Sequence, residues 1–407
     1  STSAGILTDL AKSASNLDLV ASLENRVSGG PNATQTTATY QPRAHVPVGG
    51  GHLYLPSVSG NSASVTFPTI AADDDFVLEM DVFLVDATDF HLVSGSTTDN
   101  RFAIYAGRLY FSYTEYVDLD SSLDTGSSTL TVERSGSTLT LKQDGVTKAT
   151  TSSGAADNAY ALTHLSFNGQ NATSVDPLNG YIKTATLSIE GTEGLNIDFS
   201  NATHKASSFV CSTGQTVTIN TSGEDPATIV RRPFIRLDGA RSFLNGSFNE
   251  SNTTGGYLFV VFSVNGDGGE TSGRVFVMNS AGEQGYSNNR SFLWSLRKSN
   301  TNNLGYYHEN NWRGEHTLGF DPADGVLLHE IKVVAGSQVS KINNGDIQTS
   351  SLNLSSLSSE EFDIGSNPSG NSTPAIDIEA LYLFDETLTD DEATQVRDYL
   401  NSKSSIY

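Results

Sequence analysis

Two stretches of the chain, LTVERSGSTLTLKQDG at residues 130–145 and LHEIKVVAGSQVSKINNG at residues 328–345, share one design. Each alternates apolar and polar residues, passes through a glycine turn, and alternates again up to an Asp-Gly or Asn-Gly pair. Alternation with a period of two is typical of a half-buried β-strand, and these turn dipeptides mark hairpins. The sequence therefore predicts the same hairpin in two distant places.

Matching segments flank the two hairpins in the same order. The matched pairs are LSFNG (165–169) with FDIGS (362–366), GYIKTATL (180–187) with IDIEALYL (376–383), and GHLYL (51–55) with PFIRLDG (233–239). Shared order and similar spacing indicate an internal repeat. We expect a first sandwich at residues 45–190 and a second at residues 191–388.

The bulk composition fits two β-domains. Many short alternating segments with few helical runs between them are typical of an all-β sandwich or barrel. The formal charge of −23 disfavours phosphate backbones and anionic lipid surfaces, so nucleic acid is not an expected partner. No run approaches the roughly 18 apolar residues that a membrane span needs, so membrane insertion is not expected. A single cysteine, Cys211, excludes an internal disulfide.

Residues 1–44 are predicted to form a helix followed by a polar arm. Apolar side chains recur at spacings of three and four, at Leu7, Leu10, Ala14, Leu17 and Ala21. Two interpretations stay open for this narrow seam. The helix packs on its own domain, or Leu7, Leu10 and Leu17 form an assembly seam that makes the protein a homo-oligomer.

Residues 389–407 are predicted to form a closing helix that packs on the second sandwich. Thr389 and Glu392 have the spacing of a capping box, in which each side chain accepts from the backbone of the other. Ala393, Val396 and Leu400 lie on one helical face and form its expected apolar stripe.

The closing strand IEALYLFD (378–385), followed by LTDDEATQVRDYL (388–400), resembles a particular family. It is similar to the concanavalin A-like, laminin-G-type jelly-roll domains of bacteriophage virion structural proteins. Residues 195–199, 216–219 and 234–239 also look like the start of such a domain. The first repeat lacks the closing helix and is assigned through the internal repeat. The resemblance implies two tandem concanavalin A-like jelly-roll β-sandwiches.

The resemblance also implies a function. A head fibre, capsid decoration or tail-associated protein would contact other virion proteins and present its sandwiches on the virion surface, where they would meet host polysaccharide. The alternatives are a secreted bacterial carbohydrate-binding protein or glycosidase, and a purely structural shell protein, since this fold serves many tasks.

The sequence lacks the motifs of common hydrolases. Jelly-roll glycosidases place three acids along one strand face, and the nearest fragment, Glu79-Met80-Asp81, has Leu84 where the third acid is needed. Neither a zincin motif nor a nucleophile elbow nor a phosphate loop is present. We therefore expect no enzyme activity and no catalytic residues.

Calcium is an alternative to the expected absence of a cofactor. Asp118, Asp120 and Asp124 begin like an EF-hand loop, but Leu123 interrupts the pattern, and Asp267 lies in a second acidic turn. The competing interpretation is solvated turns stabilised by their own side chains.

Flat aromatic rings beside planar polar groups suit sugar binding, because a pyranose face stacks while its hydroxyls are hydrogen-bonded. The candidates in the second repeat are Trp312, Tyr306, Tyr307, His308, Trp294 and Arg313. The alternative is that these rings only pack in the core. A weaker cluster in the first repeat is Tyr105, Tyr110, Tyr113 and Tyr116.

Overall fold

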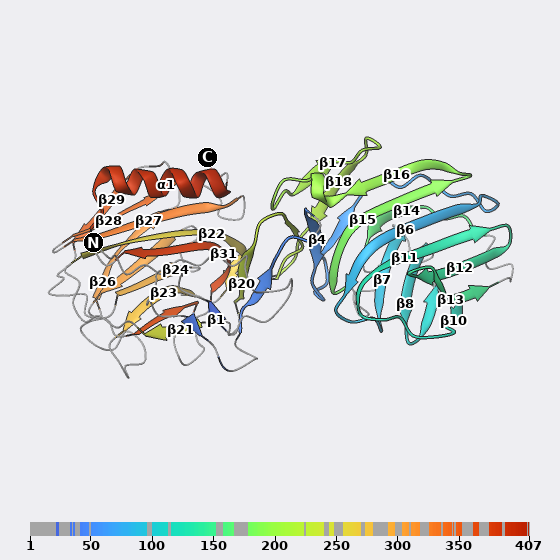
Figure 1. Cartoon of the computed structure of the whole chain (residues 1–407), viewed down its shortest axis with the longest axis horizontal. Helices are drawn as coiled ribbons and strands as arrows, with labels where there is room; N and C mark the ends of the chain where they lie inside the picture. Colours follow the sequence, from blue (N-terminus) through green and yellow to red (C-terminus); the bar gives the residue numbers. More distant parts are fainter. Residues whose placement is uncertain are drawn as a thin grey trace. The chain divides into compact units, whose positions relative to one another are not determined.

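The computed structural model divides into two compact units (Figure 1). We call residues 47–231 the central unit, and residues 1–46 together with residues 232–407 the composite unit. The structure describes residues 22–23, 33–34, 36, 41–48, 50–95, 100–112, 115–151, 158–166, 178–223, 225–239, 244–247, 255–269, 273–279, 292–297, 303–308, 311–317, 325–334, 337–343, 345, 347–351, 361–365, 374–384, 387–404 and 406.

Antiparallel strands make up most of both units. The central unit contains β4 (His52–Leu55), β5 (Ser62–Ser64), β6 (Phe76–Leu84), β7 (Phe90–Gly95), β8 (Arg101–Tyr105), β9 (Arg108–Tyr110), β10 (Tyr116–Asp118), β11 (Gly126–Ser135), β12 (Thr138–Gln143), β13 (Val146–Thr151), β14 (Leu162–Leu165), β15 (Gly180–Ile189), β16 (Thr192–Asp198), the 3-10 turn η4 (Phe199–Asn201), β17 (Ser208–Val210), β18 (Thr216–Asn220) and β19 (Thr228–Val230). The composite unit contains β1 (Ser22–Leu23), β2 (Ala33–Thr34), β3 (Arg43–His45), β20 (Phe234–Asp238), β21 (Leu244–Ser247), β22 (Gly255–Gly269), β23 (Gly273–Asn279), β24 (Phe292–Arg297), β25 (Asn303–His308), β26 (Asn311–Thr317), β27 (Leu327–Val334), β28 (Ser337–Ile342), β29 (Gln348–Ser351), β30 (Glu361–Ile364), β31 (Pro374–Phe384) and helix α1 (Asp390–Ser404).

The central unit is a sandwich of two sheets. As described, their strand orders are β10-β9-β8-β7-β14-β5-β18-β17 and β13-β12-β11-β6-β15-β4-β19, with β16 paired to β15. The alternation predicted for residues 76–84 is confirmed, because every second residue of β6 is buried. Leu78 and Met80 from one sheet share a core with Phe102 and Ile104 from the other.

The composite unit repeats this architecture. Over the described residues its sheets run β1-β2-β21-β30-β23-β24-β25-β26 and β29-β28-β27-β22-β31-β20-β3. Adding sixteen to the number of each strand from β4 to β15 gives the strand at the same place in the composite unit. The predicted fold class, two jelly-roll β-sandwiches, is confirmed by this topology.

Strands β1 to β3 precede β4 in the chain as β17 to β19 precede β20, so we count each set as the first strands of its repeat. Each set lies in the sandwich of the other repeat. Strands β1, β2 and β3 pair within the composite unit, whereas β17, β18 and β19 occupy the corresponding places in the central unit. In Figure 1 the blue strand β1 accordingly lies among the yellow-to-red strands of the composite unit. The repeat boundary expected near residue 190 is therefore not a boundary between units, because strand pairing does not follow the repeats.

The described part of the predicted N-terminal helix is not helical. Ser22 and Leu23 form β1 and pair with Thr34 and Ala33 of β2, because the sheet edge provides backbone partners that the apolar seam does not reveal. The arm likewise contributes strands β2 and β3 instead of a free linker. The proposed seam residues Leu7, Leu10 and Leu17 lie outside the described residues.

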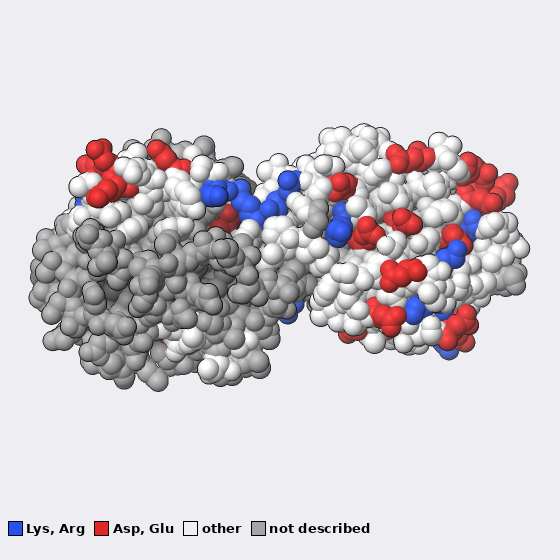
Figure 2. Space-filling view, in the orientation of Figure 1, with Lys and Arg blue, Asp and Glu red and all other residues white. Residues whose placement is uncertain are grey.

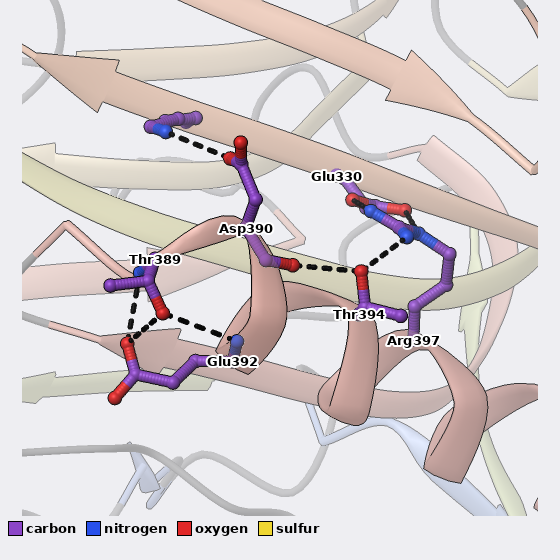
Figure 3. Close-up of polar contacts among 7 residues, drawn as sticks. Glu330, Thr389, Asp390, Glu392, Thr394 and Arg397 are labelled. Atoms are coloured by element: carbon purple, nitrogen blue, oxygen red, sulfur yellow. Dashed lines mark hydrogen bonds and ion pairs between the residues drawn. The ribbon is translucent and has the colours of Figure 1, made fainter.

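The closing helix has the predicted cap (Figure 3). The Thr389 hydroxyl accepts from the Glu392 backbone N–H at 3.3 Å, and the Glu392 carboxylate accepts from the Thr389 backbone N–H at 2.9 Å. Hydrogen bonds from the backbone and the hydroxyl of Thr389 lower the pKa of Glu392.

Among the described residues, no helix is long and apolar enough to cross a membrane.

Helix α1 covers the outer face of the sheet that contains β22. Its Ala393 and Leu400 pack with Phe259 and Val261 of β22 in a small second core. Arg397 donates from Nε and Nη2 to both carboxylate oxygens of Glu330 on β27, at 2.6 and 2.9 Å (Figure 3). A paired arrangement of this kind fixes the helix in one orientation on the sheet.

Candidate functional site

An aromatic and cationic face lies at one end of the central unit, on strands β7 to β10. Alternate residues of β8 and β9 point into the core, where Phe102, Ile104 and Leu109 are fully buried. The intervening residues, Arg101 and Tyr105 among them, lie on the opposite face of the same strands, because strand side chains alternate. The core therefore positions this second set of side chains.

Strand register brings the outward residues into rows. One row joins His91, Ala103, Tyr110 and Tyr116 across four neighbouring strands. Directly opposite residues have Cβ atoms about 5 Å apart, so the tyrosines of a row are close enough to touch.

The next row joins Tyr105, Arg108 and Asp118. We call this surface the tyrosine face, and it consists of His91, Arg101, Tyr105, Arg108, Tyr110, Tyr116 and Asp118.

The rings of the tyrosine face form a continuous set of contacts. The Tyr110 ring centroid lies 5.2 Å from that of Tyr116 and 6.2 Å from that of Tyr105. The guanidinium of Arg101 lies over the Tyr110 ring, 5.3 Å from its centroid, and that of Arg108 lies 4.1 Å from the centroid of Tyr116. Cation–π contacts of this kind hold flexible arginines in place.

The polar groups of the face are oriented as well. Arg108 donates from Nε to Asp118 Oδ1 at 2.9 Å. Hydrogen bonding to Tyr110 and then to Asp118 raises the pKa of Arg108, so its charge is fixed at every physiological pH. Tyr105 and Tyr116 are 50% and 43% exposed, so their ring surface is accessible to a ligand.

His91 forms the buried end of the first row. Burial, and secondarily the charge of Arg101, lower the pKa of His91 to about 4, so the imidazole is neutral at pH 7. The side chain is 8% exposed, and among the described residues its Nδ1 atom has no hydrogen-bond partner. Buried polar atoms usually have a partner, and this nitrogen is one of the exceptions among the described residues.

The sequence indicated part of this face. Tyr105, Tyr110 and Tyr116 were predicted as the weaker aromatic cluster, and the structure brings them together, whereas Tyr113 lies outside the described residues. His91, Arg101 and Arg108 were missed. Arg101 and Arg108 could have been found, because each lies an even number of residues from Tyr105 or Tyr110 and thus on the same strand face. His91 could not, because it precedes an irregular pairing between β7 and β8 that the sequence does not reveal.

The candidates of the second repeat come from three neighbouring strands at the end of a sheet. Trp294 in β24 pairs in register with Tyr306 in β25, and Tyr307 pairs with Trp312 in β26. His308 pairs with Asn311, while Arg313 lies at a register shift. Consecutive positions of a strand alternate between faces, so the register divides these residues into two sets.

Strand correspondence between the repeats distinguishes these two sets. β24, β25 and β26 correspond to β8, β9 and β10, which carry the tyrosine face. In register, the position of Trp294 corresponds to that of Phe102, which is fully buried in the central unit. Position 306 is the register partner of position 294, so both belong to the same face of the sheet. Position 307 follows position 306 and therefore belongs to the opposite face.

Two of the described calcium candidates pair with basic side chains. Asp118 pairs with Arg108, Asp124 accepts from Lys148 Nζ at 3.2 Å, and Asp120 follows the same strand as an exposed turn residue. In the described part of the chain, no group of three or more His, Cys, Asp or Glu residues is arranged to hold a metal ion. The side chain of Asp267 lies outside the described set.

Several other buried charged groups of the described residues form structural pairs. Arg236 binds both carboxylate oxygens of Asp377 at 2.7 and 2.9 Å, and Asn265 Nδ2 donates to the same carboxylate at 2.9 Å. In the acidic strand fragment, Glu79 is exposed and Asp81 accepts from the Thr129 hydroxyl at 2.7 Å. Acidic side chains are scattered over the visible face of the central unit and form no single patch (Figure 2).

No protein-family model and no curated protein sequence matches this chain. Solved structures with a similar fold include domains LG4-5 of the mouse laminin alpha1 chain, at 10% identity over 84% of this chain and 90% of that chain, with a TM-score of 0.30. The binding domain of botulinum neurotoxin DC in complex with rat synaptotagmin II matches at 13% identity over 51% of this chain and 49% of that chain, with a TM-score of 0.32.

A third similar structure is the exoplasmic/lumenal domain of VIP36 in its Ca²⁺/Man3GlcNAc-bound form. It has 12% identity to this chain over 39% of this chain and 82% of that chain, with a TM-score of 0.29. These identities and scores are too low to transfer a function, so the function has to be inferred from the site itself.

Proposed function

We propose that this protein is a glycan-binding surface component of a virion, and that the tyrosine face of the central unit contacts the sugar. The observation that carries the proposal is the set of three touching tyrosines on adjacent strands, two of them about half exposed, with arginines held over the rings.

The chemistry of the face suits a pyranose. The exposed Tyr105 and Tyr116 rings offer flat apolar surface for the face of a sugar ring. Arg108 and Asp118 lie in the adjacent row and provide donors and acceptors for its hydroxyls.

Alanine substitution tests this site. The wild-type chain is first screened on an array of neutral and acidic oligosaccharides, and the strongest ligand is then titrated by calorimetry. We expect Tyr116→Ala to weaken binding roughly ten-fold, because loss of one aromatic stacking contact costs about 1.4 kcal/mol. Tyr105→Ala should weaken binding in the same direction.

Tyr399→Ala is the matched control, since Tyr399 on α1 is also 50% exposed but lies in the composite unit. All three variants should unfold at nearly the wild-type denaturant concentration, because exposed substitutions change stability by about 0.5 kcal/mol or less. Equal affinity of folded Tyr116→Ala and Tyr399→Ala would remove the tyrosine face from the proposal.

The second repeat supplies a further candidate at the corresponding strands. We propose that Trp312 contributes to sugar binding, and we expect Trp312→Ala to weaken retention on host polysaccharide without unfolding the domain. Trp294→Ala is the comparison, because its position corresponds to the buried Phe102. An unchanged affinity of a folded Trp312→Ala variant would return Trp312 to the scaffold.

The virion setting rests on the resemblance of residues 378–400 to phage structural domains and on the acidic, polar composition, which suits an exposed surface. Mass spectrometry and electron microscopy of purified particles test it. Particles that lack this chain would overturn the setting, and sugar binding by the isolated protein would then favour a secreted lectin.

A further inference from the structure

The exchange of strands between the two repeats is reciprocal and keeps the same register. Ile229 of β19 lies opposite Leu53 of β4, and Ala44 of β3 lies opposite Ile235 of β20. Leu53 and Ile235 are equivalent, since they pair with Ile182 of β15 and Ile378 of β31 respectively. Each acceptor edge is therefore filled by the corresponding strand of the other repeat.

The exchanged strands are parts of both cores. Val217 and Ile229 are fully buried in the core of the central unit. Ala33 and Ala44 are fully buried in that of the composite unit. Without these strands each sandwich would expose sheet edges and core side chains, which is a strong drive toward completion by some strand.

We propose that Pro233 enforces this exchange, because the three residues between β19 and β20 cannot form the hairpin that pairing within one repeat requires. In the observed register Val230 lies opposite His52, whose equivalent in the second repeat is Phe234. Pairing of β19 with β20 would thus place Val230 opposite Phe234 and leave Arg231, Arg232 and Pro233 as the loop.

A three-residue hairpin loop is built from a type I turn followed by a residue in the left-handed region. Pro233 would occupy that third position, but its ring fixes φ near −65°, far from the positive φ that is needed. Arg232 would need a helical conformation, which the following proline disfavours. Both requirements fail at the same short loop.

The other connection carries no such restriction. Pairing of β3 with β4 would leave residues 46–51, Val-Pro-Val-Gly-Gly-Gly, as a six-residue loop with three glycines. The loop of residues 231–233 therefore decides whether the strands are exchanged between the repeats. Once β17 to β19 complete the central unit, the edge at β20 and β21 is the one left for β1 to β3.

Contacts at the second connection agree with an abrupt crossing. Arg231 donates from its backbone N–H to His204 Nδ1 at 3.0 Å, within the central unit. The adjacent Arg232 donates from Nε to Glu379 Oε2 at 3.1 Å, within the composite unit. Consecutive residues are thus held by different units, as an extended connection requires and a turn does not.

Cysteine pairs in the full-length chain test this inference, which does not depend on sugar binding. Thr34 pairs with Asn245 and Thr218 with Ser64, and these two pairs occupy equivalent positions. In a Cys211→Ser background, T34C/N245C and S64C/T218C report exchange. The matched pairs T34C/S64C and T218C/N245C report pairing within one repeat.

Each variant is oxidised at low concentration, and monomeric protein is analysed by peptide mapping. We expect cross-links in the two exchange pairs and none in the matched pairs. Cross-linking of the matched pairs in the otherwise unchanged chain would overturn the exchange.

The same four pairs are then combined with Pro233→Gly. Removal of the restriction should make pairing within one repeat accessible, so the matched pairs should cross-link in a measurable fraction of the chains. Insertion of three glycines after Arg232 serves the same purpose if Pro233→Gly does not fold. Pro47→Gly is the control and should leave only the exchange pairs cross-linked. Exchange pairs alone in both loop variants would overturn the role assigned to Pro233.

Discussion

Individual buried histidines make the central unit sensitive to acid. Burial, and then the charge of Lys183, lower the pKa of His52 to about 3, while the pKa of His91 is lowered to about 4. An unfolded histidine titrates near pH 6.5, so below that pH the unfolded state binds protons that the folded state does not. We therefore expect these two histidines to lower the free energy of unfolding as the pH falls from about 6.5 toward 4.

We predict that each of these histidines contributes a loss of about 2 kcal/mol between pH 7.5 and pH 5. Urea unfolding of the full-length protein at half-unit pH intervals measures the slope. His91→Gln should reduce the slope of the free energy of unfolding against pH. His164→Gln should reduce this slope less, because His164 is only half buried. A slope unchanged by His91→Gln would contradict the prediction.

Single residues were also where sequence reasoning was least complete. The tyrosines of the site were visible as a cluster, because aromatic residues are rare enough to stand out. The cationic partners Arg101 and Arg108 were not, since any exposed strand carries charged residues and only the register shows which of them lie over a ring.

At the scale of the element, helix α1 depends on one buried charge. Glu330 is 2% exposed, and Arg397 contacts both of its carboxylate oxygens. Removing one partner of a buried pair leaves the other charge uncompensated, which costs about 3–5 kcal/mol. We predict this loss for Arg397→Met, measured as the free energy of unfolding in urea.

Lys403→Met is the matched control, because Lys403 is an exposed base of the same helix, with its Nζ 5.7 Å from the centroid of the Tyr399 ring. Its effect should stay within about 0.5 kcal/mol. The double variant Arg397→Met/Glu330→Met should regain most of the stability. If Arg397→Met is as stable as Lys403→Met, the ion pair does not anchor the helix.

Elements with strong local signals were predicted well. The cap at Thr389 and Glu392, the closing helix, and strands with clean alternation such as β6 follow from side chains near one another in sequence. Strand β1 did not, because two residues carry too little pattern to outweigh the three-and-four spacing around them.

At the scale of the whole molecule, the repeat predicted the fold but not the composition of the units. Equivalent acceptor edges bind equivalent strands in one register, so side-chain pattern alone cannot say which copy of a strand fills which edge. The deciding feature is the loop of residues 231–233, whose effect depends on the pairing that it would have to join.

We predict that cutting both connections gives two separable particles. A chain with protease sites in place of residues 48–50 and after Arg232 is digested and analysed by native mass spectrometry. Residues 1–46 should be detected bound to the fragment that begins at residue 233. The intervening fragment should be detected alone under mild denaturant. Recovery of the N-terminal fragment bound to the intervening fragment, residues 51–232, would show pairing within the first repeat.

The two connections between the units also decide which parts of the molecule carry mechanical load. Residues 1–46 and helix α1 both belong to the composite unit, and the central unit is inserted between them in the chain. A pull between those two segments is resisted by the pairing of β3 with β20 and of β20 with β31, all inside the composite unit. The tyrosine face lies on the central unit and would keep its geometry while the composite unit is under tension.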